Sequence, residues 1–170
     1  MNSKATTVCF SGHRVFQNPT ADIEKKLDKA VRDCISKGAE CFITGGALGF
    51  DTLAARTIIR LREEFPQIKL ILALPCPPQA QTLKWSAAQV AEYREILGLA
   101  DDVRILSQAY TQSCMLDRNR YMVDNSSTLI YYLRSNRGGT SYTVSYAQKQ
   151  NIQPPANFSC HSTITFLSLF

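Results

Sequence analysis

Strand-like and helix-like segments alternate along this chain almost from end to end, and this alternation constrains the fold more than any other feature. The predicted strands cover residues 6–10, 41–43, 68–74, 103–106 and 128–133, and the predicted helices cover 20–37, 51–64, a segment that starts at Ser86, 113–125 and 140–150. Such alternation is typical of parallel βαβ units. We therefore expect an α/β fold: a single Rossmann-like three-layer domain with a mostly parallel sheet of five or more strands.

Local signals set the limits of several segments. Between residues 20 and 37 the apolar residues recur at helical spacing, and residues 68–74 are apolar at nearly every position, as in a central parallel strand. Ser86 and Gln89 predict a capping box at the start of a helix. Three prolines near the start of segment 75–83 predict a loop over the carboxyl edge of the sheet.

The length of 170 residues, with 45% apolar and 19% charged residues, fits one compact domain. We assign residues 1–150 to the Rossmann-like domain and residues 151–170 to a C-terminal tail of the same domain. The tail contains Pro154 and Pro155 and ends in an alternating apolar and polar pattern. It could add an edge strand, cover the core or make a homo-oligomer contact, and the sequence leaves all three open.

Several classes of protein are not expected. No segment approaches the ~20 consecutive apolar residues that cross a bilayer, and Met1–Lys4 do not begin a leader, so we expect a cytoplasmic protein with no membrane partner. The six cysteines are scattered without metal-binding spacing, so we expect reduced thiols and no metal. The formal net charge of +5 is spread over helix faces, and a nucleic-acid partner is therefore not expected.

Glycine-rich polar segments follow three of the predicted strands, at residues 11–14, 44–51 and 137–140. The carboxyl ends of parallel strands share one edge of a sheet, and helix N-termini there offer N–H groups to anions. We expect a ligand site at that edge rather than three unrelated tight turns. The residues that we expect to bind the ligand are Gly12, His13, Arg14, Gly45, Gly46, Gly49, Asp51, Trp85, Arg118, Asn119, Gly138, Gly139 and Thr140.

Some of these residues have a second interpretation. Arg14 suits bidentate contact with phosphate, but it could instead pair with a carboxylate of the fold while His13 holds its loop by hydrogen bonds. Asp51 could cap a helix, accept a ribose hydroxyl or act as a general acid or base. Trp85 could stack on a base or anchor its helix.

The segment around Asn119 predicts an inward-facing helix surface. Buried Asn119 needs hydrogen-bond partners, so it is expected to fix a loop or read a ligand base. Asp124 could cap, form a salt bridge or supply a catalytic carboxylate. Neither a Walker lysine motif, nor a GxGxxG fingerprint, nor a GxSxG elbow occurs, which argues against an ATPase, an ordinary dinucleotide dehydrogenase and an α/β-hydrolase.

The ordered set of motifs resembles one family. The segments are Cys9 to Arg14, Thr44 to Asp51, the proline loop leading to Trp85, and Arg118-Asn119 through Asp124 together with Gly138-Gly139-Thr140. They are similar to the YpsA-type proteins of the SLOG superfamily, which joins the Smf/DprA proteins with the LOG phosphoribohydrolases on a Rossmann-like fold. The resemblance spans about residues 6 to 152.

This resemblance implies a nucleotide or nucleotide-derived ligand, held at Gly12, Arg14, the segment from Gly45-Gly46 to Asp51 and the Gly139-Thr140 turn, and no other cofactor. LOG enzymes carry a PGGxGTxxE motif, whereas Gly138-Gly139-Thr140 follows Arg137 and has no glutamate at the corresponding spacing. We therefore expect a sensor or regulatory binding module more than an enzyme. The alternatives are a LOG-like nucleoside monophosphate phosphoribohydrolase, using Asp51 or Asp124, and a DNA-associated protein of the Smf/DprA kind.

Overall fold

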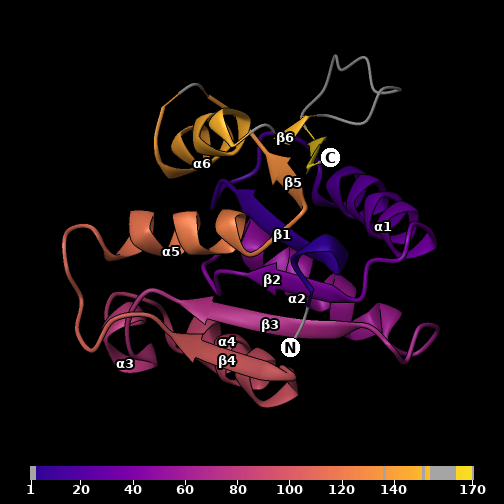
Figure 1. Ribbon diagram of the computed structural model, residues 1–170. Coiled ribbons are helices and arrows are strands. Elements are labelled where there is room, and N and C mark those ends of the chain that lie inside the picture. Colours follow the sequence, from indigo (N-terminus) through magenta and orange to yellow (C-terminus); the bar gives the residue numbers. More distant parts are fainter. Residues whose placement is uncertain (1–2, 136, 151, 154–163, 170) are drawn as a thin grey trace.

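The computed structural model describes residues 3–135, 137–150, 152–153 and 164–169. Its strands form one sheet in the order β4-β3-β2-β1-β5-β7-β6. Figure 1 shows the first five of these side by side, from β4 at the bottom upward. The strands are β1 (Thr7–Gly12), β2 (Cys41–Thr44), β3 (Lys69–Leu74), β4 (Asp102–Ile105), β5 (Thr128–Tyr132), β6 (Ile152–Gln153) and β7 (Ile164–Leu169). Strands β1 to β5 are mutually parallel, which confirms the predicted α/β Rossmann-like fold.

Helices cover both faces of this sheet. They are α1 (Thr20–Ser36), α2 (Phe50–Leu61), α3 (Pro78–Gln81), α4 (Ala87–Leu99), α5 (Cys114–Asp124) and α6 (Gly139–Lys149), and a short 3-10 turn, η1 (Lys4–Thr6), precedes β1. Apolar residues of α1, α2 and α4 pack with Phe10, Phe42 and Leu72 on one face. Residues of α5 and α6 pack with Cys9 and Ile43 on the other. The result is the three-layer arrangement that the alternation predicts.

The sequence placed most elements within a few residues. The capping box of α4 is present, because the Ser86 hydroxyl accepts from Gln89 N–H and the Gln89 side chain accepts from Ser86 N–H. The prediction that residues 75–83 form a loop is wrong in one detail, since Pro78–Gln81 makes the single helical turn α3. Proline is tolerated at the first helical position, where its missing N–H would have no intrahelical partner.

The tail takes the first of its three expected roles. Strand β7 runs antiparallel beside β5, and β6 pairs with β7, so the C-terminal segment extends the sheet on one side. Pro154, Pro155 and Cys160 lie outside the described residues. The five other cysteines are free and buried, as expected of reduced thiols.

Within the described ranges, no helix combines the length and apolar character that a membrane span requires.

Candidate binding cleft

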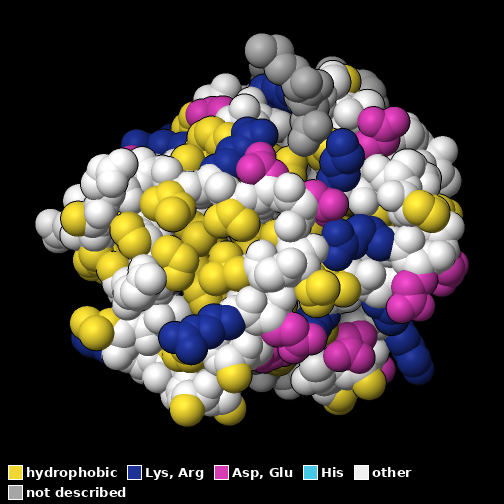
Figure 2. All heavy atoms as spheres, turned by 90° about the horizontal axis from the view of Figure 1, so that it is seen from below, with side chains coloured by type: hydrophobic (Ala, Val, Ile, Leu, Met, Phe, Trp, Pro, Cys, Tyr) yellow, Lys and Arg dark blue, Asp and Glu magenta, His cyan; other side chains and the backbone are white. Residues whose placement is uncertain are grey.

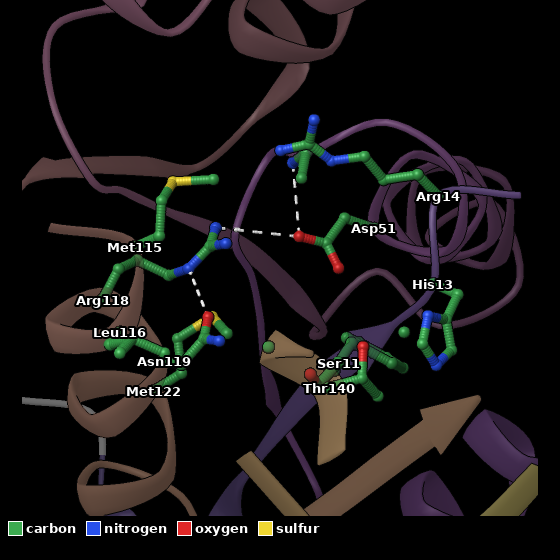
Figure 3. Close-up of a pocket in the computed structure, with 14 residues that line it drawn as sticks. Ser11, His13, Arg14, Asp51, Met115, Leu116, Arg118, Asn119, Met122 and Thr140 are labelled. Carbon is green, nitrogen blue, oxygen red and sulfur yellow. Dashed lines mark hydrogen bonds and ion pairs between the residues drawn. The ribbon is translucent and has the colours of Figure 1, made fainter. Parts of the chain in front are cut away.

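A cleft of about 260 Å³ opens at the carboxyl edge of the sheet. It brings together the loop after β1, the loop between β2 and α2, the start of α6 and one face of α5 (Figure 3). The lining residues are Phe10, Ser11, Gly12, His13, Arg14, Ala47, Asp51, Met115, Leu116, Arg118, Asn119, Met122, Gly139 and Thr140. The three glycine-bearing loops that follow separate strands therefore meet around one cavity, as the sequence predicted.

The loop after β1 is held by its backbone. His13 N–H donates to the Tyr132 carbonyl at 3.3 Å, and the His13 carbonyl accepts from Phe50 N–H at 3.2 Å. Gly12 lies against Phe50, and a Cβ added at Gly12 would come within 2.4 Å of the Phe50 Cβ. Glycine at this position is what allows the first strand to pass so close to the start of α2.

The loop between β2 and α2 also needs glycine for two reasons. Gly49 has a φ of +78°, and a Cβ added there would lie 2.4 Å from the Arg14 carbonyl oxygen. The loop is closed by Thr52 Oγ1, which donates to the Ala47 carbonyl at 3.0 Å, and by Gln81 Nε2, which donates to the Gly46 carbonyl at 2.9 Å. These contacts tie the loop to α2 and α3, next to Asp51.

Asp51 and Arg118 form a buried charged pair at the floor of the cleft. Arg118 Nη1 lies 3.7 Å from Asp51 Oδ2, and the two side chains are 6% and 7% exposed. Arg118 also donates from Nη1 to the Gly45 carbonyl and from Nε to Asn119 Oδ1 at 2.8 Å. Because a Cβ at Gly45 would coincide with this guanidinium, only glycine fits there. Arg118 thereby joins α5 to the β2 loop.

Of the three roles left open for Asp51, capping of α2 is not what the structure shows. The N-cap is Gly49, without a side-chain capping bond, and Asp51 Oδ2 instead accepts from Ala47 N–H at 3.2 Å. Burial raises the pKa of Asp51, and Arg118, the Ala47 N–H and Arg14 oppose that increase. Burial likewise lowers the pKa of Arg118, with Asp51 acting in the opposite direction. Each charge is therefore held mainly by the other.

Helix α6 begins at the cleft with an uncapped N-terminus. Its N-cap is Gly138, with a φ of +92° and no side-chain capping bond, and Thr140, the second residue of the helix, is buried and lines the cavity. The first N–H groups of a helix have no intrahelical acceptor and carry a partial positive charge. This end of α6 can therefore donate to an anion in the cleft.

The opposite wall comes from α5. Met115, Leu116 and Met122 give it an apolar surface, and the buried Asn119 side chain lies among them (Figure 3). The cleft thus has a polar, basic side and an apolar side.

His13 contributes the least satisfied group of the cleft. Its Nε2 is buried and has no hydrogen-bond partner within the described part of the chain. Burial lowers the pKa of His13, and the nearby positive charge of Arg134 lowers it further. The ring is therefore neutral near pH 7 and keeps a polar atom that a ligand can satisfy.

Not every predicted residue reaches the cleft. Gly45, Gly46, Gly49 and Gly138 shape the loops behind it without lining it. Trp85 lies away from the cavity and packs edge-on against Tyr93 at 5.3 Å, which is the anchoring role. Asp124, at the end of α5, accepts a hydrogen bond from Tyr146 at 2.9 Å and is exposed.

Sequence reasoning missed part of the α5 wall. Met115 and Met122, together with Arg118 and Asn119, are spaced as one face of a helix, and this spacing could have identified them as neighbours. Ser11 and Ala47 were also missed individually, although both lie inside predicted loops. In the described segments no group of His, Cys, Asp and Glu is arranged to hold a metal ion.

Comparisons with known proteins agree with this architecture. The family model YpsA, described as the YspA SLOG family, matches residues 14–168. The SPbeta prophage-derived protein YoqJ of Bacillus subtilis is 31% identical over 148 residues, which cover 79% of this chain and 85% of YoqJ. A UPF0398 protein of Halalkalibacterium halodurans is 31% identical over 136 residues, covering 78% of this chain and 71% of that protein.

Two solved structures share the fold. One is DNA processing protein A from Helicobacter pylori, described in a study of its single-stranded DNA binding mode, with a TM-score of 0.58 and 20% identity. The other is DNA processing protein A from Streptococcus pneumoniae, with a TM-score of 0.61 and 15% identity. The matches cover 85% and 87% of this chain but only 61% and 48% of those longer chains.

Proposed function

The chain belongs to the YspA SLOG family, and we propose that its cleft binds the phosphate of a nucleotide or nucleotide-derived small molecule as a sensor or regulatory module. The observation that carries this proposal is the meeting of the three glycine-bearing loops around one cavity. Such loops let a phosphate approach backbone N–H groups closely.

The two sides of the cleft suggest how the ligand lies. The phosphate faces the start of α6 and Arg14, because these supply helix N–H groups and a guanidinium. The base or another apolar part faces Met115, Leu116 and Met122 on α5. His13 also lines the cleft, and its Nε2 is buried and unpaired in the described structure. A volume of about 260 Å³ favours a mononucleotide over a dinucleotide.

The binding test uses thermal denaturation with a panel of nucleoside monophosphates, cyclic nucleotides and dinucleotides. A ligand that binds only the folded chain stabilises it by mass action, by about 2.7 kcal/mol at a hundredfold excess over Kd. Arg14→Gln should abolish most of the shift. Arg94→Gln is the matched control, since Arg94 is an exposed arginine on α4 outside the cleft and its loss changes net charge equally. No stabilisation by any compound at millimolar concentration would refute the proposal.

An enzymatic variant of this function is a phosphoribohydrolase that releases a base. Asp51 is the only carboxylate among the cleft residues, but it accepts from Ala47 N–H and lies against Arg118. Helix α6 carries no acidic residue that could replace the LOG glutamate. These facts favour binding without hydrolysis. Chromatography of nucleoside monophosphates incubated with the protein distinguishes binding from hydrolysis. Free base that forms with the natural chain but not with Asp51→Asn would establish that the protein is a hydrolase.

A DNA-associated function is supported by one observation, the likeness to DNA processing protein A. Exposed Arg134 and Arg137 beside the β5–α6 connection offer positive charge near the cleft. If this function holds, a fluorescent single-stranded oligonucleotide will bind with an affinity that falls steeply as salt rises. If the fluorescence anisotropy of the oligonucleotide does not change when the protein is added at low salt, the DNA-associated function is ruled out.

A further inference from the structure

Strand β4 forms one edge of the sheet, and within the described residues no strand pairs with its outer side. It is the lowest strand in Figure 1. Two of its side chains are unusually exposed for apolar residues, Val103 at 39% and Ile105 at 50%. Figure 2, seen from this side of the molecule, shows hydrophobic side chains gathered over a broad area.

The backbone groups that face outward from β4 can be identified. Lys69 N–H donates to the Glu40 carbonyl, so odd-numbered residues of β3 bond toward β2 and even-numbered ones toward β4. Leu106 N–H donates to the Leu74 carbonyl, and Leu74 is opposite Ile105. It follows that residues 102, 104 and 106 bond to β3. The N–H and C=O groups of Val103 and Ile105 point away from the sheet.

This edge carries only part of the usual protection against pairing. Edge strands are shielded by short length, charged side chains, lysine or proline; β4 is short and has two charged residues, but residues 102–105 contain neither proline nor lysine. The two charged side chains are engaged on the α5 face, where Arg104 donates to Asp102 at 2.8 Å and to the Tyr121 hydroxyl at 2.5 Å. Val103 and Ile105 lie on the other face of the sheet. Their partners on β3 are Leu72 and Leu74, which pack under α4.

We propose that β4 is a dimerisation edge, at which a second copy of this chain pairs antiparallel with Val103 opposite its own counterpart. Charge selects this register. With Val103 on the two-fold axis, Asp102 of each copy faces Arg104 of the other, twice per dimer. The neighbouring register, Val103 opposite Ile105, would place the two Arg104 side chains directly opposite each other, which is unfavourable.

The occupant is a second copy because the Asp-Val-Arg sequence is complementary to itself when reversed. A closed two-fold contact uses the same patch on both chains. Leu99, 41% exposed at the end of α4, can add apolar area beside the strands. A four-residue strand buries little surface, so the dimer should be weak and depend on protein concentration.

Sedimentation velocity over a range of concentrations tests the proposal with paired charge variants. R104D gives two aspartates per strand and D102R gives two arginines, so each alone should weaken self-association about tenfold or more. An equal mixture of R104D and D102R restores both opposite-charge pairs, and it should form heterodimers about as well as the natural chain. A variant that merely misfolds could not produce this rescue.

V103P provides an independent check. It removes an N–H that points to solvent in the monomer and to the other copy in the dimer, so it should abolish dimerisation while the far-ultraviolet circular dichroism stays native. A natural chain that remains monomeric at all concentrations would overturn the proposal. So would a dimer that V103P leaves intact, or mixed charge variants that fail to associate.

Discussion

The molecule contains two kinds of arginine–carboxylate contact, and they differ in burial and in geometry. On the outer helices, Arg32 contacts Glu64 at 2.7 Å and Arg56 contacts Glu95 at 2.8 Å, with all four side chains at least a third exposed. At the cleft, Arg118 and Asp51 are almost fully buried, yet their closest approach is 3.7 Å. Of these three pairs, the two short ones are on the surface and the long one is at the site.

The exposed pairs belong to the solvated faces of the outer helices, whereas the buried pair organises the cleft. Exposed pairs contribute little, because water and salt screen them. A buried pair costs much desolvation energy, and it survives only if every charged group keeps partners. Arg118 meets this condition through Gly45 and Asn119 as well as Asp51. Its role is therefore to tie three elements together beside the ligand cavity.

The largest expected effect follows from removing that arginine. Arg118→Met leaves Asp51 buried without its main countercharge and the Gly45 carbonyl without a donor, so it should cost about 3–5 kcal/mol of unfolding free energy. Arg56→Met is the control, and it should cost less than about 1 kcal/mol because its ion pairs are exposed. Urea unfolding monitored by circular dichroism measures both. Equal losses in the two variants would erase the distinction between the two regions.

A second contrast uses glycines in the same two regions. Gly49→Ala forces a side chain into a φ of +78° and within 2.4 Å of the Arg14 backbone, so it should cost about 2–4 kcal/mol. Gly98→Ala lies near the end of α4 with nothing within 4 Å, and it should gain about 0.5 kcal/mol from helix propensity. The midpoint of thermal unfolding should fall for Gly49→Ala and rise for Gly98→Ala. A neutral Gly49→Ala would mean that the loop can relax.

The two regions also differed in how far the sequence could predict them. Apolar periodicity located the strands, and the glycine-rich loops after β1, β2 and β5 were expected at one edge because parallel strands point the same way. The burial of Arg118 could not be predicted, since its partners Gly45 and Asp51 are more than 60 residues away. Likewise, the alternating pattern of the tail fixed neither the partner of β7 nor its antiparallel direction, which depend on tertiary contacts.

A smaller effect concerns the pH dependence of stability, which should have opposite signs in the two regions. The pKa of Asp51 is raised in the folded chain by burial, so the folded state holds a proton that the unfolded state releases above about pH 4. Its contribution to stability is therefore lost as pH rises toward the folded pKa. Hydrogen bonds from Arg32 lower the pKa of Glu64, so its contribution is lost as pH falls.

Urea unfolding of the natural chain, Asp51→Asn and Glu64→Gln between about pH 3 and about pH 7 would measure this difference, because the contribution of Glu64 changes below its ordinary pKa of 4.5. The natural chain should lose stability relative to Asp51→Asn as pH rises, and gain it relative to Glu64→Gln. Slopes of the same sign would show that the charge of Arg118 outweighs burial and places the pKa of Asp51 below its usual range.

The smallest expected effect is on anion binding at His13. Because its pKa is lowered mainly by burial, the ring gains its charge only below about pH 6.5, and a bound anion should favour the charged form.

Sulfate is a suitable probe, since its charge is constant over this range while that of a phosphate monoester changes. Stabilisation of the natural chain by sulfate should therefore increase from pH 7.5 to about pH 5.5, whereas His13→Gln should show a smaller increase, because only the Asp51 carboxylate of the cleft still titrates there. Lys69→Gln controls for charge far from the cleft, because Lys69 begins β3 at the opposite end of the strand from the cleft. If His13→Gln keeps the full pH dependence, the proton is taken up elsewhere, and His13 does not serve the anion.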